Sequence, residues 1–476
     1  RALYREALRH ALAAGDTDGG VRLFRKEFRA MVTRGEVLTS LEKLNVLPDA
    51  VVRGHADLAA CKAWLLYLQG TTDQAQGYAQ VAVSVSEQHL LPEARGTFYT
   101  FRTYLALNWG DPGEAAEWAH RALALIPGEE GAFRILLSSY LGQAQALCGQ
   151  RAAAITTLRQ AFYMGRGMGH HPKLLDALLH LVPLLRDQGR LRQAMELCEQ
   201  AAAYYRDARG QPLGVAGLAY LALAMLHYEF DQIPKAREWV DLALPLCAEL
   251  GVVYYSLVGR HLLARIERAQ GMREDSMRSF AALREAAESP SPRRRRLALR
   301  MMAEMQLEDG TIDAAARTLQ DPLLATCWEA ELLRARLLQA QERHAEVLAL
   351  LDRRECEARR DGLDGERVTI FLLRFRSLRA AGRKEEAVDA LAGALSLAAT
   401  DGHRRPFVDA GPEVLAAARS LRHVAPEFVA GFPESVAPMS NVVPGLVEPL
   451  TPKDLQVLEL LHLGLQNREI ADRLSI

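Results

Sequence analysis

A short motif returns about every forty residues through most of this 476-residue chain, and it limits the folds that the chain can adopt. Each copy has an apolar stretch, a glycine, four mostly polar residues and then a small residue. The copies begin at Gly70, Gly110, Gly149, Gly189, Asp231, Gly271, Gly310, Gln341 and Gly382. The residues five positions later are Ala75, Ala115, Ala154, Ala194, Ala236, Ser276, Ala315, Glu346 and Ala387. The steps are 39 to 42 residues, except one of 31 before the degraded copy at Gln341. Such a period indicates a repeat architecture.

The residues of the motif explain the repeating unit. Glycine ends a helix because it accepts the left-handed conformation without steric cost, and the small residue lets the next helix pack closely. In the copy at Gly110, Asp111 can cap the new helix and Pro112 suits its first turn. A single helix pair cannot bury its apolar face, so each pair must stack on its neighbours. The sequence therefore predicts an all-α fold, a right-handed superhelix of antiparallel helix pairs from about Gly54 to about Ala399. It resembles a tetratricopeptide array whose helices are longer than the ~34-residue unit implies.

The flanks of the repeats differ in composition, which predicts four regions. Residues 1–53 predict a helical arm that does not follow the forty-residue period. Residues 54–428 predict the repeat domain, with about nine repeats and a C-terminal helical element. Residues 429–449 contain four prolines and predict a linker, because proline lacks the N–H group and disfavours helix before itself. Residues 450–476 are helical again. The chain begins with Arg1 rather than Met, so we expect a piece of a longer protein.

The last region, LTPKDLQVLELLHLGLQNREIADRLSI, predicts an incomplete helix-turn-helix. Thr451 can cap a first helix, Gly464 interrupts it and Asn467 can cap a second. The stretch resembles the opening of the LuxR-type DNA-binding domain, LTxRExxVLxLLxxGxSNxEIAxxLxIS, with Asp454 and Gln466 as departures. In that family the recognition helix follows this point. The resemblance leaves only Asn467 and Arg468 to approach DNA phosphates, so we expect this stretch by itself to bind DNA weakly.

Two further segments resemble large MalT-like regulators of the LuxR-type class. The stretch RRPFVDAGP at 404–412 resembles an element that precedes the DNA-binding domain in that family, and residues 11–49 resemble its arm. The family's order is an ATPase module, an arm, a tetratricopeptide-like sensor and a DNA-binding domain. The chain has no G-x-x-x-x-G-K-[ST] phosphate loop, so we expect ATP to bind only in a module upstream of this sequence.

The resemblance implies a signal-sensing and oligomerisation region of a bacterial transcription regulator. A small-molecule or protein effector would bind the helical repeats, the chains would self-associate, and DNA would bind through the completed C-terminal domain. The expected location is the cytoplasm. The alternative is a free-standing tetratricopeptide-like scaffold for protein interactions, without a DNA role.

Composition and motifs exclude several other classes of protein. Lys and Arg number 58 against 59 Asp and Glu, so the body lacks the cation excess of a non-specific nucleic-acid binder. The six cysteines are far apart, which predicts small apolar groups in a reducing compartment rather than a metal or redox site. His170 and His171 lie in a glycine-rich turn, where we expect no metal. No catalytic motif and no membrane-length apolar run appears, so we expect neither an enzyme nor a membrane protein.

Two sets of residues are candidates for a binding site. Aromatic residues cluster between 204 and 255, where they could stack on a flat ligand on the concave face, or simply pack between helices. The effector-site candidates are Tyr204, Tyr220, His227, Tyr228, Trp239, Tyr254 and Tyr255. The second set is the basic run from Arg293 to Arg296, which we interpret as a solvated helix start, with an anion or partner contact as the alternative.

Overall fold

The computed structural model describes residues 2–433, apart from 35–36, 70, 85–91, 127, 129–130, 169–173, 207–208, 251 and 326. This part of the chain is helical, and its only β-type pairing is one isolated bridge between Arg206 and Pro212. The predicted all-α class is confirmed. The incomplete helix-turn-helix at 450–476, including Asn467 and Arg468, lies outside the described residues, as do His170 and His171.

The helices form an arm, nine antiparallel pairs and a C-terminal element. The arm contains α1 (Ala2–Ala13), α2 (Thr17–Arg34), α3 (Val37–Leu44) and α4 (Asp49–Gly54). The first five pairs are α5 (Ala56–Leu68) with α6 (Thr72–Ser84), α7 (Pro92–Trp109) with α8 (Pro112–Leu125), α9 (Gly131–Leu147) with α10 (Arg151–Gly167), α11 (Leu174–Asp187) with α12 (Leu191–Tyr204), and α13 (Ala216–Glu229) with α14 (Ile233–Glu249). The other four are α15 (Val253–Ala269) with α16 (Arg273–Ala287), α17 (Pro292–Glu308) with α18 (Ile312–Leu319), α20 (Glu331–Ala340) with α21 (His344–Arg360), and α22 (Asp364–Ala380) with α23 (Lys384–Asp401). The short helices α19 (Pro322–Ala325) and η2 (Trp328–Ala330) precede α20, and α24 (Arg405–Asp409), α25 (Pro412–Ser420) and α26 (Pro426–Ala430) complete the described chain.

At the turns that the structure describes, the repeat motif lies inside the helix pair, as the sequence predicts, with one shift of register. Gly149, between α9 and α10, has a φ of 76°, and Ala154 after it is completely buried. Asp231, between α13 and α14, takes the same left-handed conformation with a φ of 60°, although it is not glycine. Ala236, five residues later, is also completely buried. The motif therefore sets both the turn and the closeness of the two helices.

The degraded copy was predicted one residue too early. In the turn between α20 and α21, the left-handed residue is Glu342, with a φ of 59°, rather than Gln341. The residue five positions after it, Val347, is completely buried, whereas Glu346 is exposed and pairs with Arg343. A glutamate at the left-handed position conceals the motif because this conformation normally favours glycine.

The predicted linker begins later than expected. Helix α26 extends to Ala430, and Val429 and Phe432 are buried in the C-terminal core. Phe432 contacts Phe407 and Phe428, with ring centroids 5.3 and 5.1 Å apart. Ordered structure therefore extends a few residues into the segment 429–449, and the rest of this segment lies outside the described residues.

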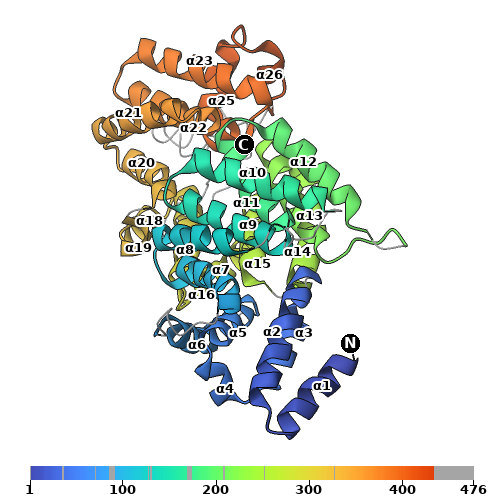
Figure 1. Ribbon diagram of the computed structural model, residues 1–476. Helices are drawn as coiled ribbons and strands as arrows, with labels where there is room; N and C mark the ends of the chain where they lie inside the picture. The colour runs from blue at the N-terminus through green and yellow to red at the C-terminus, as the bar shows by residue number, and fades with distance from the viewer. Residues whose placement is uncertain are drawn as a thin grey trace.

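The pairs wind far enough for distant repeats to meet. The arm and the C-terminal helices lie at opposite ends of the molecule in Figure 1, while α17 contacts α7, α22 contacts α11, and α24 contacts α13. We call these contacts between distant repeats seams. At the first seam, the guanidinium group of Arg294 lies 3.7 Å from the ring centroid of Tyr67 and donates a 2.6 Å hydrogen bond to the Tyr67 carbonyl. Ser291 donates to the carbonyl of Asn108 at 3.1 Å.

A second seam joins α22 to the third and fourth pairs. Glu366 on α22 pairs with Arg151 on α10 and with Arg354 on α21, and the three side chains are 3 to 5% exposed. Next to it, Gly365 packs directly against the end of α11. A Cβ atom at Gly365 would lie 1.9 Å from the carbonyl oxygen of Arg186 and 2.9 Å from the amide nitrogen of Gly189. A residue without a side chain is therefore required where α22 meets the turn between α11 and α12.

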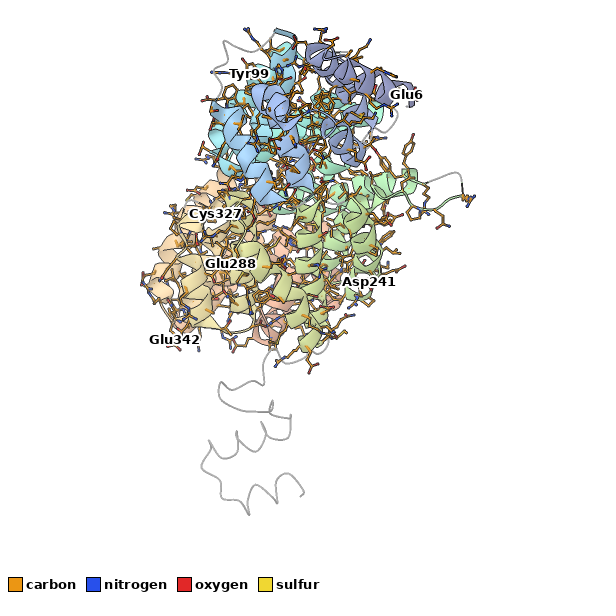
Figure 2. The ribbon with its side chains drawn as sticks, turned by 90° about the horizontal axis from the view of Figure 1, so that it is seen from below. Glu6, Tyr99, Asp241, Glu288, Cys327 and Glu342 are labelled. Carbon is orange, nitrogen blue, oxygen red and sulfur yellow. The ribbon has the colours of Figure 1, made fainter. Side chains whose placement is uncertain are left out.

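The outer surface carries much of the charge. Figure 2 shows Asp241 and Glu342 near the edge of the molecule, and both residues are exposed, as is Glu288. Four of the six free cysteines are buried as predicted, but Cys148 and Cys356 are exposed, which corrects the expectation that all six pack as apolar groups. Within the described residues, no helix has the length and hydropathy of a membrane span.

Replacing Ala154 with Trp should destabilise the protein by ~1–3 kcal/mol or more, because the site between α9 and α10 has no room for a larger side chain. Thermal and urea unfolding would measure the loss. The control is Ala153→Trp on the exposed face of the same helix, which should leave the unfolding curve nearly unchanged. Equal stability of the two variants would contradict the predicted packing.

Replacing Gly365 with Ala should lower stability by ~1–3 kcal/mol, because the new Cβ atom would overlap the backbone of Arg186. Gly77→Ala on α6 is the matched control, since nothing lies within 4 Å of the position its Cβ would take. Alanine has the higher helix propensity, so the control should be neutral or stabilising by up to ~1 kcal/mol. Urea unfolding of both variants decides whether α22 rests on the α11–α12 turn in solution.

Candidate functional site

The interior of the superhelix contains a cavity of about 440 Å³. Its wall comes mainly from the first helices of successive pairs, namely α9, α11, α13, α15, α17, α20 and α22, together with α24. Contacts between distant repeats bring α20, α22 and α24 opposite α11, α13 and α15, so the concave face of the repeats forms a partly enclosed pocket. A cavity of this volume is typical of small-molecule sites.

The structure separates the aromatic residues that the sequence proposed as one effector site. Tyr228 and Tyr254 line the cavity. Tyr228 lies beneath the guanidinium groups of Arg265 and Arg405, which are 4.7 and 4.6 Å from its ring centroid. Tyr254 contacts the ring of His180, with centroids 5.1 Å apart. Tyr254, which is half-buried, is therefore placed where a ligand could touch it, whereas Tyr228 is 2% exposed and supports the two arginines.

The other five candidates lie elsewhere. Tyr220 is 3% exposed and packs on Trp239 at 5.1 Å between α13 and α14. The hydroxyl of Tyr255 donates a 2.7 Å hydrogen bond to Asp176, and Tyr204 is 50% exposed at the end of α12. His227 faces a second, shallower cavity of about 380 Å³. Most of the aromatic cluster therefore serves helix packing, which the sequence analysis named as the alternative.

The basic run at the start of α17 is not a solvated helix start, which corrects the expectation. Arg294 is 4% exposed and belongs to the seam with Tyr67, and among the four arginines only Arg295 is exposed. Arg293 and Arg296 face the cavity, and Arg293 donates a 2.5 Å hydrogen bond to the side chain of Gln143. Ser291 caps the helix by accepting from the amide of Arg294. The superhelical turn covers a helix face that would otherwise meet water.

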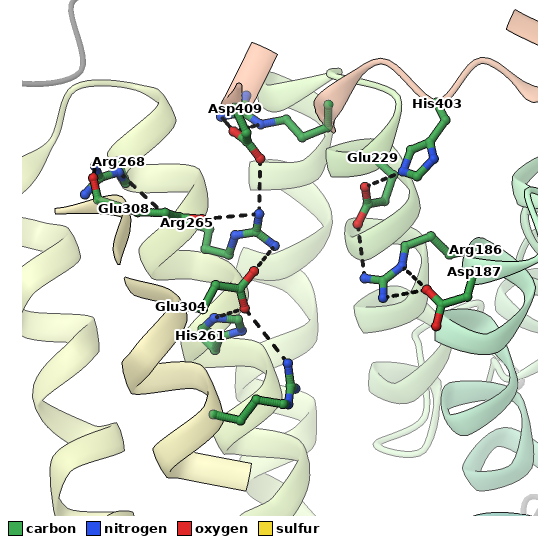
Figure 3. A network of polar contacts seen from close by, with 12 residues as sticks. Arg186, Asp187, Glu229, His261, Arg265, Arg268, Glu304, Glu308, His403 and Asp409 are labelled. Carbon is green, nitrogen blue, oxygen red and sulfur yellow. Dashed lines mark hydrogen bonds and ion pairs between the residues drawn. The ribbon is translucent and has the colours of Figure 1, made fainter. Parts of the chain in front are cut away.

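A network of charged residues borders the cavity on the side of α24 (Figure 3). Arg265 on α15 contacts Glu304 at 3.3 Å, Glu308 at 3.5 Å and Asp409 at 3.2 Å. His261 lies 3.3 Å from Glu304. Because Asp409 lies at the end of α24, this network fastens the C-terminal element to α15 and α17.

A second part of the network fastens the same element to α11 and α13. Glu229, at the end of α13, lies 3.0 Å from His403 and 3.4 Å from Arg186, which also pairs with Asp187 at 2.9 Å (Figure 3). Arg405 completes the contact by pairing with Asp231 at 2.8 Å. The segment RRPFVDAGP, singled out in the sequence, is therefore a docking element at the cavity wall.

Burial and neighbouring charges act in opposite directions on the acids of this network. Burial would raise the pKa of Glu229, but the hydrogen bond with His403 and the charge of Arg186 outweigh it and lower this pKa to about 2. Burial likewise opposes ionisation of Glu304, yet Arg265 and His261 hold its pKa well below the usual value. On the opposite wall, burial lowers the pKa of His180 to about 4. The carboxyl groups of Glu229 and Glu304 are thus ionised at neutral pH.

Sequence reasoning did not identify most of the residues that form the cavity. Arg293, Arg296 and Arg300 recur at helical spacing and so share one face of α17, which was a readable signal. The sequence does not say whether that face points inward. Arg336 and Arg376 each follow another arginine by two positions, Arg334 and Arg374, and nothing local marked them out, although both line the cavity.

Comparison with known proteins gives one family and two kinds of relative. A family model described as the MalT-like TPR region matches residues 96–423. Over 99% of its length, this chain is 24% identical to two proteins named HTH-type transcriptional regulator MalT. One is from Yersinia pestis (strain Pestoides F) and the other from Serratia proteamaculans (strain 568). The chain spans 56% of the length of these two relatives. Among solved structures, a Rap protein in complex with competence and sporulation factor matches 74% of this chain and 99% of its own with a TM-score of 0.51 and 12% identity, which shows a shared fold.

Replacing Glu229 with Gln should flatten the pH dependence of stability. The folded pKa of about 2 lies below the ordinary value of 4.5, so the carboxylate stabilises the fold above pH 4.5 and this contribution is lost as pH falls toward 2. The free energy of unfolding of the wild type should therefore be roughly 3 kcal/mol higher than that of the variant at pH 6. This difference in free energy should shrink between pH 4.5 and pH 3.

Urea unfolding across this pH range measures the difference. Glu196→Gln is the matched control, because Glu196 is exposed and forms no ion pair with a residue in the described part. Its curve should follow the wild type at every pH. A Glu229→Gln curve that also runs parallel to the wild type would show that Glu229 is not held by His403 and Arg186 in solution.

Proposed function

Because the chain belongs to the family of MalT-like TPR regions, we propose that a small-molecule effector binds inside its superhelix and thereby controls DNA binding by a transcription regulator. The relatives named MalT are HTH-type transcriptional regulators, and this chain matches about half of their length. Three further properties belong to the proposal. They are binding of an effector, DNA binding through a domain that starts at about residue 450, and self-association of the chains.

The cavity is the observation that carries the proposal. It is lined by helices from distant repeats, and its volume of about 440 Å³ suits a metabolite. Contacts between distant repeats border it on opposite sides, which leaves less room for an extended peptide or a protein than for a small ligand. A small molecule is therefore favoured over a macromolecular effector.

The position of α24 supports coupling between the effector and the C-terminal end of the chain. Pro406 and Asp409 of α24 line the cavity, and the same element contacts α13 and α15 through charged side chains. An effector that contacts both walls would bind differently to the closed and opened arrangements. Such differential affinity is the only way in which a ligand can shift an equilibrium between two states.

A thermal-shift screen of this chain against metabolites should find a ligand that raises the melting temperature. At a free concentration of about 100 times Kd, binding adds about 2.7 kcal/mol to the apparent stability. Thr369→Trp should abolish the shift, since Thr369 faces the cavity from α22 and a tryptophan there would fill part of it.

The control for this screen is Val388→Trp on α23, whose side chain is 46% exposed on the outside. It should retain the full ligand-induced shift. If a ligand raises the melting temperature of wild type, Thr369→Trp and Val388→Trp equally, the effector binds outside the cavity and the proposed site is wrong.

A further inference from the structure

We propose that the cavity takes a small organic anion, a carboxylate or phosphate ester with an apolar body, and that Arg336 and Arg376 bind its charged group. This inference rests on the proposed function, since it names the chemical class of the effector.

Arginine dominates the charged residues of the wall. The described residues that line the cavity include eight arginines and no lysine, against six carboxylates. The arginines are Arg186, Arg265, Arg293, Arg296, Arg300, Arg336, Arg354 and Arg376. Eight positive and six negative charges leave a net charge of +2 with the histidines neutral. The planar guanidinium group matches carboxylate and phosphate in a two-point contact, which an ammonium group does not.

Most of the carboxylates are already neutralised by particular arginines. Asp187 and Glu229 pair with Arg186, Glu304 and Asp409 pair with Arg265, and Glu366 pairs with Arg151 and Arg354. The sixth, Glu329, acts electrostatically on Arg300. The cations that remain are Arg293, Arg296, Arg336 and Arg376, and none of them forms an ion pair with a residue in the described ranges.

Arg336 and Arg376 are neighbours of like charge. They come from α20 and α22, which contact each other, and both face the cavity. Partial burial and the charge of Arg336 lower the pKa of Arg376, and Glu413 acts in the opposite direction. Arg336 is half-buried and Arg376 keeps part of its surface exposed, so an anion could reach both side chains. An anion between them would replace mutual repulsion with two attractive contacts.

The remaining wall is suited to an apolar body. Leu332 lies one helical turn before Arg336, and Leu372 lies one turn before Arg376, and both line the cavity. Leu297 and Met301 face the same space from α17. A neutral, highly hydroxylated ligand would leave the four arginines without counter-charges and would cover these apolar side chains poorly.

Two fluorescent probes with the same aromatic body test the charge requirement. The probe 8-anilino-1-naphthalenesulfonate carries one negative charge, and N-phenyl-1-naphthylamine carries none. Titration of this chain with each probe gives a Kd. Repeating the titrations from 50 to 300 mM salt shows how much of the binding free energy comes from electrostatic attraction. The anionic probe should bind at least about tenfold more tightly, and its affinity should fall with salt.

The decisive variant is the double substitution Arg336→Gln with Arg376→Gln. It should weaken the anionic probe about tenfold or more and leave the neutral probe unchanged. Arg379→Gln is the matched control, because Arg379 is exposed in the last turn of the same helix and does not line the cavity. Melting temperatures of all variants confirm that the fold is retained. Competition by benzoate and by phenyl phosphate then distinguishes a carboxylate ligand from a phosphate ester.

The outcomes separate this inference from the proposed function. Equal affinity for both probes, failure of the anionic probe to bind, or an unaffected double variant would overturn the anion site. If Thr369→Trp nevertheless abolishes binding of the neutral probe, the cavity still binds ligands and the proposed function stands. If Thr369→Trp affects neither probe, the probes bind elsewhere, and both the anion site and the cavity as effector site are wrong.

Discussion

Glu366 lies between the guanidinium groups of Arg151 and Arg354, and this buried contact joins helix pairs that are far apart in the chain. Arg151 belongs to the third helix pair and Glu366 to the ninth, so the contact fixes how far the array winds before it meets itself. Removing these charges from water is costly, and only their mutual attraction and good hydrogen bonds offset that cost. We therefore expect the contact to set the position of α22 relative to α10 more than to add to the free energy of unfolding. With α22 held at the turn after α11, the concave face becomes a cavity.

Neighbouring repeats and distant repeats are joined by different kinds of interaction. Apolar side chains such as Leu158, Leu181 and Leu391 form the cores within and between successive pairs. The seams between distant repeats, by contrast, contain Arg294 on Tyr67, Arg265 with Asp409, and Glu229 with His403. Water can replace charged contacts more readily than it can enter a close-packed core. Opening of the superhelix would therefore follow the seams and leave the repeats intact.

The sequence predicted what depends on local rules and missed what depends on curvature. Gly149 and Ala154 identify a turn and a close contact within one pair, and these signals predicted the helix pairs. The register failed by one residue at Gln341 because Glu342, a glutamate, occupies the position that glycine normally marks. The cavity could not be predicted, because small rotations between pairs accumulate before α22 meets α11. For the same reason, the density of aromatic residues did not distinguish Tyr254 in the cavity from Tyr220 in the core.

Helix α24 gives the proposed sensor a physical route from the cavity to the end of the repeats. Phe407 is completely buried in the core that α24, α25 and α26 share with α22 and α23, so the C-terminal element and the ninth helix pair form one packed unit. Arg405 and Asp409 hold that unit to α13 and α15 by charge, at a wall that a ligand would also contact. Coupling between two sites is typically worth about 1–3 kcal/mol, the range expected from gaining or losing one or two such contacts. A ligand that strengthens or weakens the hold of α24 by this amount would change its position without unfolding any repeat.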